Sequence, residues 1–323
     1  MITTEEGWHI LPDGMKLYTK TWKPDIPTRA ILAFVHGFSD HCNAYYEFFP
    51  TLASYGIEVR AFDQRGWGRS VTTPASRGLT GPTTVVISDI HSFLMSIKDS
   101  IERESTAQPA QASESRTTPP IFLLGHSMGG GEVLYYMLNS PLFPPWIRGV
   151  LAYSPLIALH PKTQPSPLIV ATGRLAAKIR PHRQMRQLLD PYLMCRDKRV
   201  CEDWKNDPLC HNLGTLEGLA GLLDRSAWLR KLKSGDRASP KEDTALWVCH
   251  GTADQINDFE ASKRFSQVVG VRDKTFKAYE GGFHKLHGEP DGIKEALAKD
   301  IAEWILDRCD SGLQDDMGSK SKL

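Results

Sequence analysis

The sequence predicts an α/β fold in which a mostly parallel central sheet carries helices on both faces and a helical cap is inserted. Short apolar runs alternate with amphipathic stretches through most of the chain, a pattern typical of parallel sheets that are covered on both sides. The alternation stops after Pro155 and resumes at Ala245. We therefore expect a core of residues 1–154 and 240–309, a cap of residues 155–239 folded over the carboxyl edge of the sheet, and a flexible tail of residues 310–323.

The first part of the core contains strands, helices and turns in a simple order. An Asp13-Gly14 pair suits a tight turn between two strands. Apolar residues from Val86 to Ile101 have helical spacing on one stripe. Residues 105–120 are rich in Ser, Thr, Ala, Gln and Pro, and we expect a mobile surface loop there. The predicted strands are residues 8–11, 15–22, 30–35 and 57–62, and the predicted helices are residues 45–53 and 86–101.

At the centre of the chain we expect a strand, a sharp turn and a helix. An apolar run at residues 121–124 leads into the G-x-S-x-G pattern around Ser127, and a helix-like stretch follows. Such an elbow presents the serine at its tip, in front of the helix N-terminus. Gly125 and Gly129 have a steric reason to be glycine, because the turn brings strand and helix close together. We interpret Ser127 as a candidate nucleophile; the alternative is a chance glycine-rich turn.

The second part of the core is expected to complete the sheet. Its predicted strands are residues 245–249 and 275–279, and its predicted helix is residues 293–308; a further strand, residues 149–153, ends the first part. Within the cap, residues 216–229 are amphipathic, and basic residues cluster between Arg174 and Arg186.

Composition excludes several classes of function. The formal net charge is +1 and no basic stripe indicates a nucleic-acid partner. The N-terminus does not resemble a signal peptide, and no apolar run reaches the roughly 18 residues that cross a bilayer, so we expect a soluble intracellular protein. The six cysteines are too scattered for a disulfide framework. Zinc ligation is disfavoured by irregular spacing, and no metal or cofactor is expected; the residues considered were Cys195, Cys201, Cys210 and His211.

The chain ends with Ser321, Lys322 and Leu323, which spell a peroxisomal address read by an import receptor. A polar stretch from Asp310 precedes them and would leave them accessible. We therefore expect a peroxisomal location, otherwise cytoplasmic, with the import receptor as a partner.

Two further side chains at strand ends can activate the serine. A serine hydroxyl becomes a good nucleophile when an imidazole takes its proton and a carboxylate orients that imidazole. Asp254 and His284 each follow a predicted strand and should lie at its carboxyl end, where ligands of open α/β sheets bind. The order Ser127, Asp254, His284 is that of the α/β-hydrolases. The alternatives weighed are His126, His250 and His287 for the base, and Asp207 and Asp258 for the acid.

The negative charge of a tetrahedral intermediate must be met by donors that are already in place. One expected donor is the backbone N–H of Met128, at a helix N-terminus. The other is the N–H of Phe38, in the His36-Gly37-Phe38 loop that follows an early strand. We expect His36 to brace this loop rather than take part in catalysis.

Together these motifs resemble the monoacylglycerol lipases of the α/β-hydrolase superfamily, also described as serine aminopeptidase S33-like hydrolases. The likeness runs from Trp8 to the last helix. It implies Ser127, Asp254 and His284 as the catalytic triad, Phe38 and Met128 as oxyanion donors, and a cap that forms an apolar acyl-chain tunnel and a membrane-facing surface. The resemblance rests on His36-Gly37-Phe38, residues 63–70, residues 125–130, Asn206-Asp207-Pro208-Leu209, residues 250–254, and His284 with His287.

These inferences predict a serine ester hydrolase that cleaves a monoacylglycerol to glycerol and a fatty acid through an acyl-enzyme. Other members of the family share every catalytic motif, so a lysophospholipid, an acyl-CoA or a specialised-metabolite ester in the peroxisome is the alternative substrate. A non-catalytic hydrolase-fold binding protein is a remoter alternative, because such proteins usually lack a triad residue. Transient contact between the cap and a membrane surface is also expected.

Overall fold

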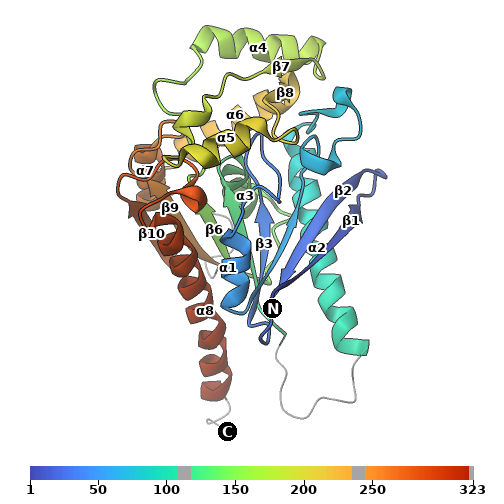
Figure 1. Cartoon of the computed structure of the whole chain (residues 1–323), viewed down its shortest axis with the longest axis vertical. Coiled ribbons are helices and arrows are strands. Elements are labelled where there is room, and N and C mark those ends of the chain that lie inside the picture. The colour runs from blue at the N-terminus through green and yellow to red at the C-terminus, as the bar shows by residue number, and fades with distance from the viewer. Residues whose placement is uncertain (108–117, 235–243, 320–323) are drawn as a thin grey trace.

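A computed structural model describes residues 1–107, 118–234 and 244–319. Within these residues, an eight-stranded sheet has the order β1-β2-β4-β3-β5-β6-β9-β10 (Figure 1). The β1–β2 and β2–β4 pairs are antiparallel, and all other neighbours in this sheet are parallel. This arrangement confirms the predicted fold class. The strands are β1 (Thr3–Ile10), β2 (Lys16–Lys23), β3 (Ala30–Val35), β4 (Ile57–Phe62), β5 (Ile121–His126), β6 (Ile147–Tyr153), β9 (Ala245–Gly251) and β10 (Lys274–Tyr279).

Helices cover both faces of the sheet, because successive side chains of a strand point to opposite sides. Every side chain of β3 is buried. On the face of the sheet that carries Ala33, the buried core includes residues of α2, α3 and α7, and on the face that carries Phe34 it includes residues of α1 and α8. The helices are α1 (Phe48–Ser54), α2 (Thr83–Ala107), α3 (Met128–Asn139), α7 (Phe259–Val268) and α8 (Ile293–Ser319).

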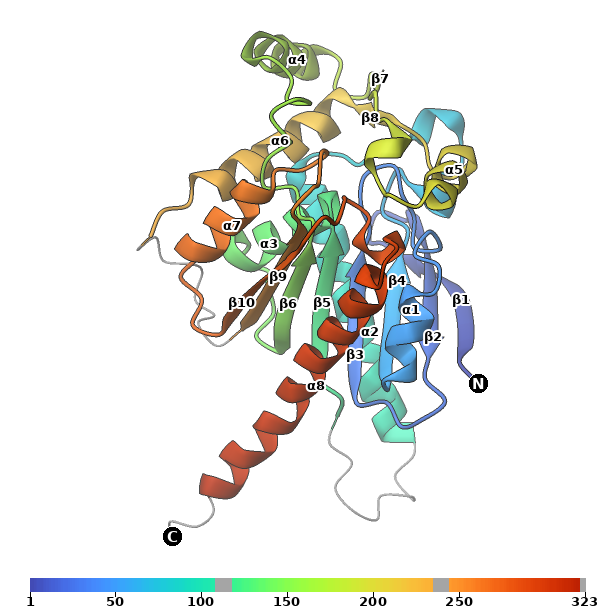
Figure 2. The same cartoon turned by 60° about the vertical axis from the view of Figure 1, so that its left-hand side comes forward.

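The cap elements lie over the carboxyl ends of the strands. Figures 1 and 2 show them as one layer above the sheet, with α4 outermost. Short strands β7 and β8 form a small antiparallel pair that the sequence did not indicate, because three residues are too few to show a period. The elements are α4 (Pro167–Ile179), β7 (Gln184–Arg186), α5 (Lys198–Asn206), β8 (Leu213–Thr215) and α6 (Leu216–Lys231). Among the described residues, no helix combines the length and apolar character needed to cross a membrane.

Some boundaries differ from those predicted. The last helix was expected to end at Arg308, but α8 continues to Ser319, through residues assigned to a flexible tail. Once a helix has formed, each added residue gains a backbone hydrogen bond, so a polar extension needs no buried face. Helix α7 was missed because its apolar residues are few, although Asp258 caps it through the N–H groups of Glu260 and Ala261. Residues 108–117 of the predicted surface loop and the targeting residues 321–323 lie outside the described residues, and both remain predictions.

Candidate active site

Ser127 occupies a strained turn between β5 and α3. Its φ of 54° and ψ of −115° are unusual for a residue with a side chain. The turn requires close packing, because a Cβ at Gly125 would lie 2.3 Å from the Gly129 oxygen and one at Gly129 would lie 2.2 Å from the Val35 oxygen. Both positions therefore need glycine, and the elbow presents the serine at the carboxyl edge of the sheet.

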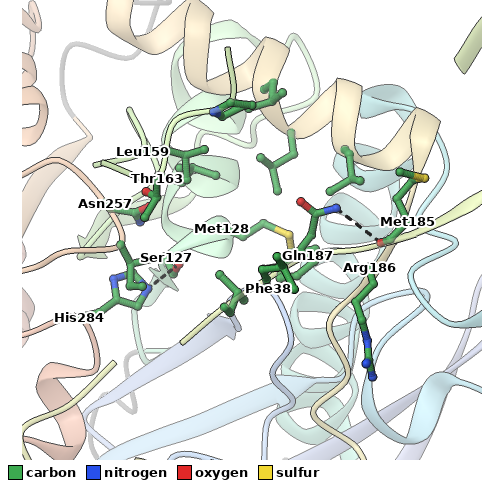
Figure 3. Close-up of a pocket in the computed structure, with 18 of the residues that line it drawn as sticks. Phe38, Ser127, Met128, Leu159, Thr163, Met185, Arg186, Gln187, Asn257 and His284 are labelled. Atoms are coloured by element: carbon green, nitrogen blue, oxygen red, sulfur yellow. Dashed lines mark hydrogen bonds between the residues drawn. The ribbon is translucent and has the colours of Figure 1, made fainter. Parts of the chain in front are cut away.

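The side chains of Ser127, His284 and Asp254 are joined by hydrogen bonds. His284 Nε2 lies 2.8 Å from Ser127 Oγ (Figure 3), and His284 Nδ1 lies 2.8 Å from Asp254 Oδ2. Because an ionised carboxylate only accepts hydrogen bonds, the ring proton is on Nδ1 and Nε2 accepts from the serine hydroxyl. This tautomer allows His284 to remove the serine proton. The loops after β5, β9 and β10 thus bring together the three residues predicted from the sequence.

Asp254 is held as a buried carboxylate at both of its oxygens. Oδ1 accepts the backbone N–H groups of Ile256 and Asn257 at 2.7 and 3.0 Å. Oδ2 accepts not only from His284 but also from Nε2 of His250, at 2.9 Å. Burial alone would raise the pKa of Asp254, but the two imidazoles outweigh burial and hold this pKa well below its usual range. The carboxylate is therefore ionised and fixed in position.

His250 belongs to the site through a contact with Asp254 that was not predicted from the sequence. It was weighed only as an alternative base, whereas the structure places its buried ring against Asp254. Its Nδ1 lies 2.8 Å from Ser262 Oγ and accepts from that hydroxyl, so its Nε2–H donates to the carboxylate. The available sequence signal was the position of His250 and Asp254 at the end of one strand.

The other candidate bases and acids have different partners. His126 Nδ1 contacts the hydroxyl of Tyr45, and His287 Nδ1 contacts the hydroxyl of Tyr153, each at 3.0 Å. Burial, with the neighbouring His284 and Lys285, lowers the pKa of both histidines well below the ordinary value. Among the candidate acids, Asp258 caps α7 and Asp207 accepts from a histidine of a core loop. Of the histidines weighed, His284 is the one whose ring contacts Ser127 among the described hydrogen bonds.

The two predicted oxyanion donors lie beside the serine. Met128 is the first residue of α3, so its N–H has no acceptor within the helix. Phe38 follows Gly37, where an added Cβ would lie only 3.1 Å from Ser127 Cβ. Both residues line the same cavity as Ser127 (Figure 3). In the part of the chain that the structure describes, no hydrogen bond uses either N–H, so both can donate to a substrate oxygen.

His36 orients one of these donors. Its Nε2 accepts from the backbone N–H of Gln64 at 2.9 Å, so its Nδ1 carries the proton and donates to the Gly37 oxygen at 2.8 Å. The Gly37 oxygen and the Phe38 N–H belong to one planar peptide unit. His36 therefore sets the direction of the Phe38 N–H.

A cavity of about 560 Å³ opens above Ser127, between the core and the cap. It also touches the buried ion pair of Asp40 and Lys285, whose charged atoms are 3.1 Å apart. An apolar cavity beside a nucleophile suits an acyl chain. Aliphatic side chains form much of its wall, among them Leu156, Leu159, Ile169, Val170, Leu188, Leu216, Leu219, Leu222 and Leu223.

One group of side chains in the described residues has the composition of a metal site, and it differs from the set weighed in the sequence. It consists of His41, Asp207 and Cys210. His41 Nδ1 accepts from the backbone N–H of Asn43, so its Nε2–H donates to Asp207 Oδ2 at 2.8 Å. A histidine bound to a metal donates through its free nitrogen instead. The hydrogen bonds therefore fit a structural pair better than a metal site.

Comparison with known proteins adds independent information. The family model described as serine aminopeptidase S33 matches residues 26–291. A putative monoglyceride lipase of Schizosaccharomyces pombe is 33% identical and covers 90% of this chain and 71% of its own length. The crystal structure of a soluble variant of Saccharomyces cerevisiae monoglyceride lipase, in complex with a substrate analogue, has a TM-score of 0.80 at 24% identity, covering 95% of this chain and 96% of that one. The Paleococcus ferrophilus monoacylglycerol lipase has a TM-score of 0.72 at 28% identity, covering 91% of this chain and 100% of that one.

Proposed function

This chain belongs to the serine aminopeptidase S33 family of hydrolases, and from that we propose that it is a serine ester hydrolase that cleaves monoacylglycerols to glycerol and a fatty acid. The observation that carries the proposal is the hydrogen-bonded series Ser127, His284 and Asp254 beside a largely aliphatic cavity. The monoglyceride and monoacylglycerol lipases among its relatives support the choice of substrate.

In the acylation half of the reaction, Ser127 Oγ attacks the carbonyl carbon of the ester. His284 Nε2 takes the hydroxyl proton as the new bond forms, and Asp254 stabilises the resulting imidazolium. The N–H groups of Phe38 and Met128 donate to the oxyanion; the loss of one such donor typically lowers turnover by about 10²–10³-fold. The intermediate then collapses, glycerol leaves with the proton from His284, and the acyl group stays on the serine.

Deacylation repeats these steps with water in place of the serine hydroxyl. His284 takes a proton from the water as its oxygen attacks the acyl carbon. The second intermediate releases the fatty acid, and the proton returns to Ser127 Oγ. The acyl chain occupies the cavity under the cap during both halves.

We further propose that α4 docks on lipid surfaces. None of its side chains is buried, and Leu168 and Ile179 are 73% and 74% exposed. Leu168, Leu175 and Ile179 fall on one helical stripe, and basic residues from Lys178 to Arg186 follow. A helix with an apolar stripe beside basic residues suits a membrane interface. Figure 2 places α4 on the outer side of the cap, away from the sheet.

A parallel substrate assay tests the proposed function. Purified protein is given monooleoylglycerol, a lysophosphatidylcholine and oleoyl-CoA, with Ser127→Ala as the inactive control. The expected result is a preference for monooleoylglycerol in the wild type and no hydrolysis in the variant. A clear preference for the acyl-CoA would overturn the substrate. Failure to hydrolyse any of the three would favour a non-catalytic binding protein.

Sedimentation with vesicles tests the docking surface. Leu168→Ser with Ile179→Ser should reduce the bound fraction on vesicles of phosphatidylcholine and phosphatidylserine. Leu142→Ser is the matched control, since Leu142 is 45% exposed and precedes β6, at the end of the sheet opposite the cap. Equal binding of all variants would show that α4 is not the docking surface.

A further inference from the structure

The loop that carries Phe38 is held by part of the cap. We call residues 37–43 the oxyanion loop, and Trp204 together with residues 207–212 the cap clamp. The clamp contains most of the Asn-Asp-Pro-Leu motif, to which the proposed mechanism assigns no role.

Three hydrogen bonds join the clamp to Ser39 and His41 of the oxyanion loop. Trp204 Nε1–H donates to the Ser39 carbonyl oxygen at 2.8 Å. The Ser39 hydroxyl donates to Asn212 Oδ1 at 2.8 Å. His41 Nε2–H donates to Asp207 Oδ2, also at 2.8 Å. The clamp therefore contacts the loop immediately after Phe38.

Ser39 needs this support because its backbone is strained. Its φ is 56°, in the left-handed region that a residue with a Cβ disfavours. Such a conformation persists where the surrounding contacts impose it. Trp204 holds the carbonyl of Ser39 and Asn212 holds its hydroxyl. Since Ser39 is bonded directly to Phe38, relaxation of its φ would move the Phe38 peptide.

The clamp also supports the side chain of Phe38. The Phe38 ring packs edge-on against Trp67, with ring centroids 4.7 Å apart. Trp67 in turn stacks on His211 of the clamp, at 4.8 Å and an interplanar angle of 10°. His211 Nε2–H donates to the Gly66 oxygen at 3.0 Å, which fixes the stacking ring. The clamp thus supports Phe38 in two ways, through the next residue, Ser39, and through the ring of Trp67.

We infer that the cap clamp is a positioning element of the oxyanion hole, so that the cap holds the Phe38 N–H in place as well as enclosing the acyl chain. The inference rests on the proposed ester hydrolase function. On this view, the 204–212 part of the cap cannot move away without releasing an oxyanion donor. Movement of the cap during substrate entry is then restricted to its outer elements, such as α4.

A double-mutant cycle on the bond between Ser39 and Asn212 tests the inference. The substrate is p-nitrophenyl butyrate, whose short chain needs little of the cavity. Ser39→Ala and Asn212→Ala should each lower kcat by about tenfold with KM nearly unchanged, less than the loss of a whole donor. The double variant should be no slower than either single variant, because both remove one bond. Asn212→Asp keeps an acceptor oxygen and should restore most of the rate.

Affinity for a trifluoromethyl ketone separates positioning from a general loss of structure. The adduct of the ketone with Ser127 places an oxyanion between the two donors. The affinity of Ser39→Ala and of Asn212→Ala for the ketone should therefore fall in proportion to their kcat. Asn206→Ala is the matched control, since Asn206 contacts only Glu202 of its own helix among the described hydrogen bonds. It should behave like the wild type.

Several outcomes would overturn the inference while leaving the proposed function intact. One is that the wild type hydrolyses the ester and the Ser39→Ala or Asn212→Ala variant does so with the same kcat. Another is that these variants melt at a lower temperature than the wild type but bind the ketone with unchanged affinity. If Asn212→Ala fails to fold, Ser39→Ala removes the same bond and decides the question. A wild type that hydrolyses no ester would instead overturn the proposed function.

Discussion

Replacing Asp254 by Asn should lower kcat by about 10⁴-fold while the protein stays folded. The reason lies in how Asp254 is held. The backbone N–H groups of Ile256 and Asn257 donate to Oδ1 and therefore require an oxygen at that position. The amide nitrogen of an Asn must then take the position of Oδ2, where it faces His284 Nδ1.

That arrangement reverses the proton on the catalytic imidazole. An amide nitrogen is a donor, so His284 Nδ1 must accept and the ring proton moves to Nε2. Nε2 can then no longer accept the proton of Ser127, 2.8 Å away. The loss of about 10⁴ corresponds to about 5 kcal/mol of transition-state stabilisation. It should appear in kcat, since the acid does not touch the acyl chain.

The assay is hydrolysis of p-nitrophenyl butyrate beside a thermal melt. Asp258→Asn is the matched control, because Asp258 caps α7 and Asn is an equally good N-cap. The control should keep wild-type kcat. A folded Asp254→Asn variant with kcat within tenfold of the wild type would refute the tautomer argument.

Three more predictions concern the base, the elbow and a buried carboxyl group. In the same assay, His284→Gln should lose at least about 10⁴-fold in kcat and His287→Gln less than tenfold, because of these two histidines only His284 contacts the serine in the described structure. The reverse ranking would show that the base is misassigned. Gly129→Ala should destabilise the fold by more than about 3 kcal/mol in a urea titration, because its Cβ would meet backbone oxygen atoms at 2.2 and 2.5 Å. A Gly129→Ala variant as stable as the wild type would contradict this packing. Burial raises the pKa of Glu132 from 4.5 to about 7 against the lowering effect of Arg225. Between about pH 4.5 and pH 7 the folded state binds more protons than the unfolded state, so the free energy of unfolding falls as the pH rises. Raising the pH from 5 to 8 should lower this free energy by about 3 kcal/mol more in the wild type than in Glu132→Gln. Equal losses in the two proteins would contradict the prediction.

The fold class and the three central side chains were predictable because each depends on a local pattern. Ser127, Asp254 and His284 all follow short apolar runs, and parallel strands bring their carboxyl ends to one edge. Gly125 and Gly129 mark the elbow for a steric reason that applies wherever such a turn forms. These signals require no knowledge of the packing between distant segments.

The rest depends on contacts between segments far apart in the chain. The bond from Trp204 to Ser39 joins residues 165 positions apart, and no local period encodes it. His250 was readable as a histidine at a strand end, but its hydrogen bond to Asp254 depends on how the loop folds back. Helix α4 was not outlined by periodicity, because none of its side chains is buried and no single apolar stripe packs it against a core.

Reaction with a fluorophosphonate probe, read together with release of glycerol from monooleoylglycerol, tests the proposed nucleophile most directly. The wild type should be labelled and should release glycerol, and Ser127→Ala should do neither. A wild type that stays unlabelled and inactive, or a Ser127→Ala variant that is labelled and active like the wild type, would contradict the assignment of Ser127 as the nucleophile of an ester hydrolase.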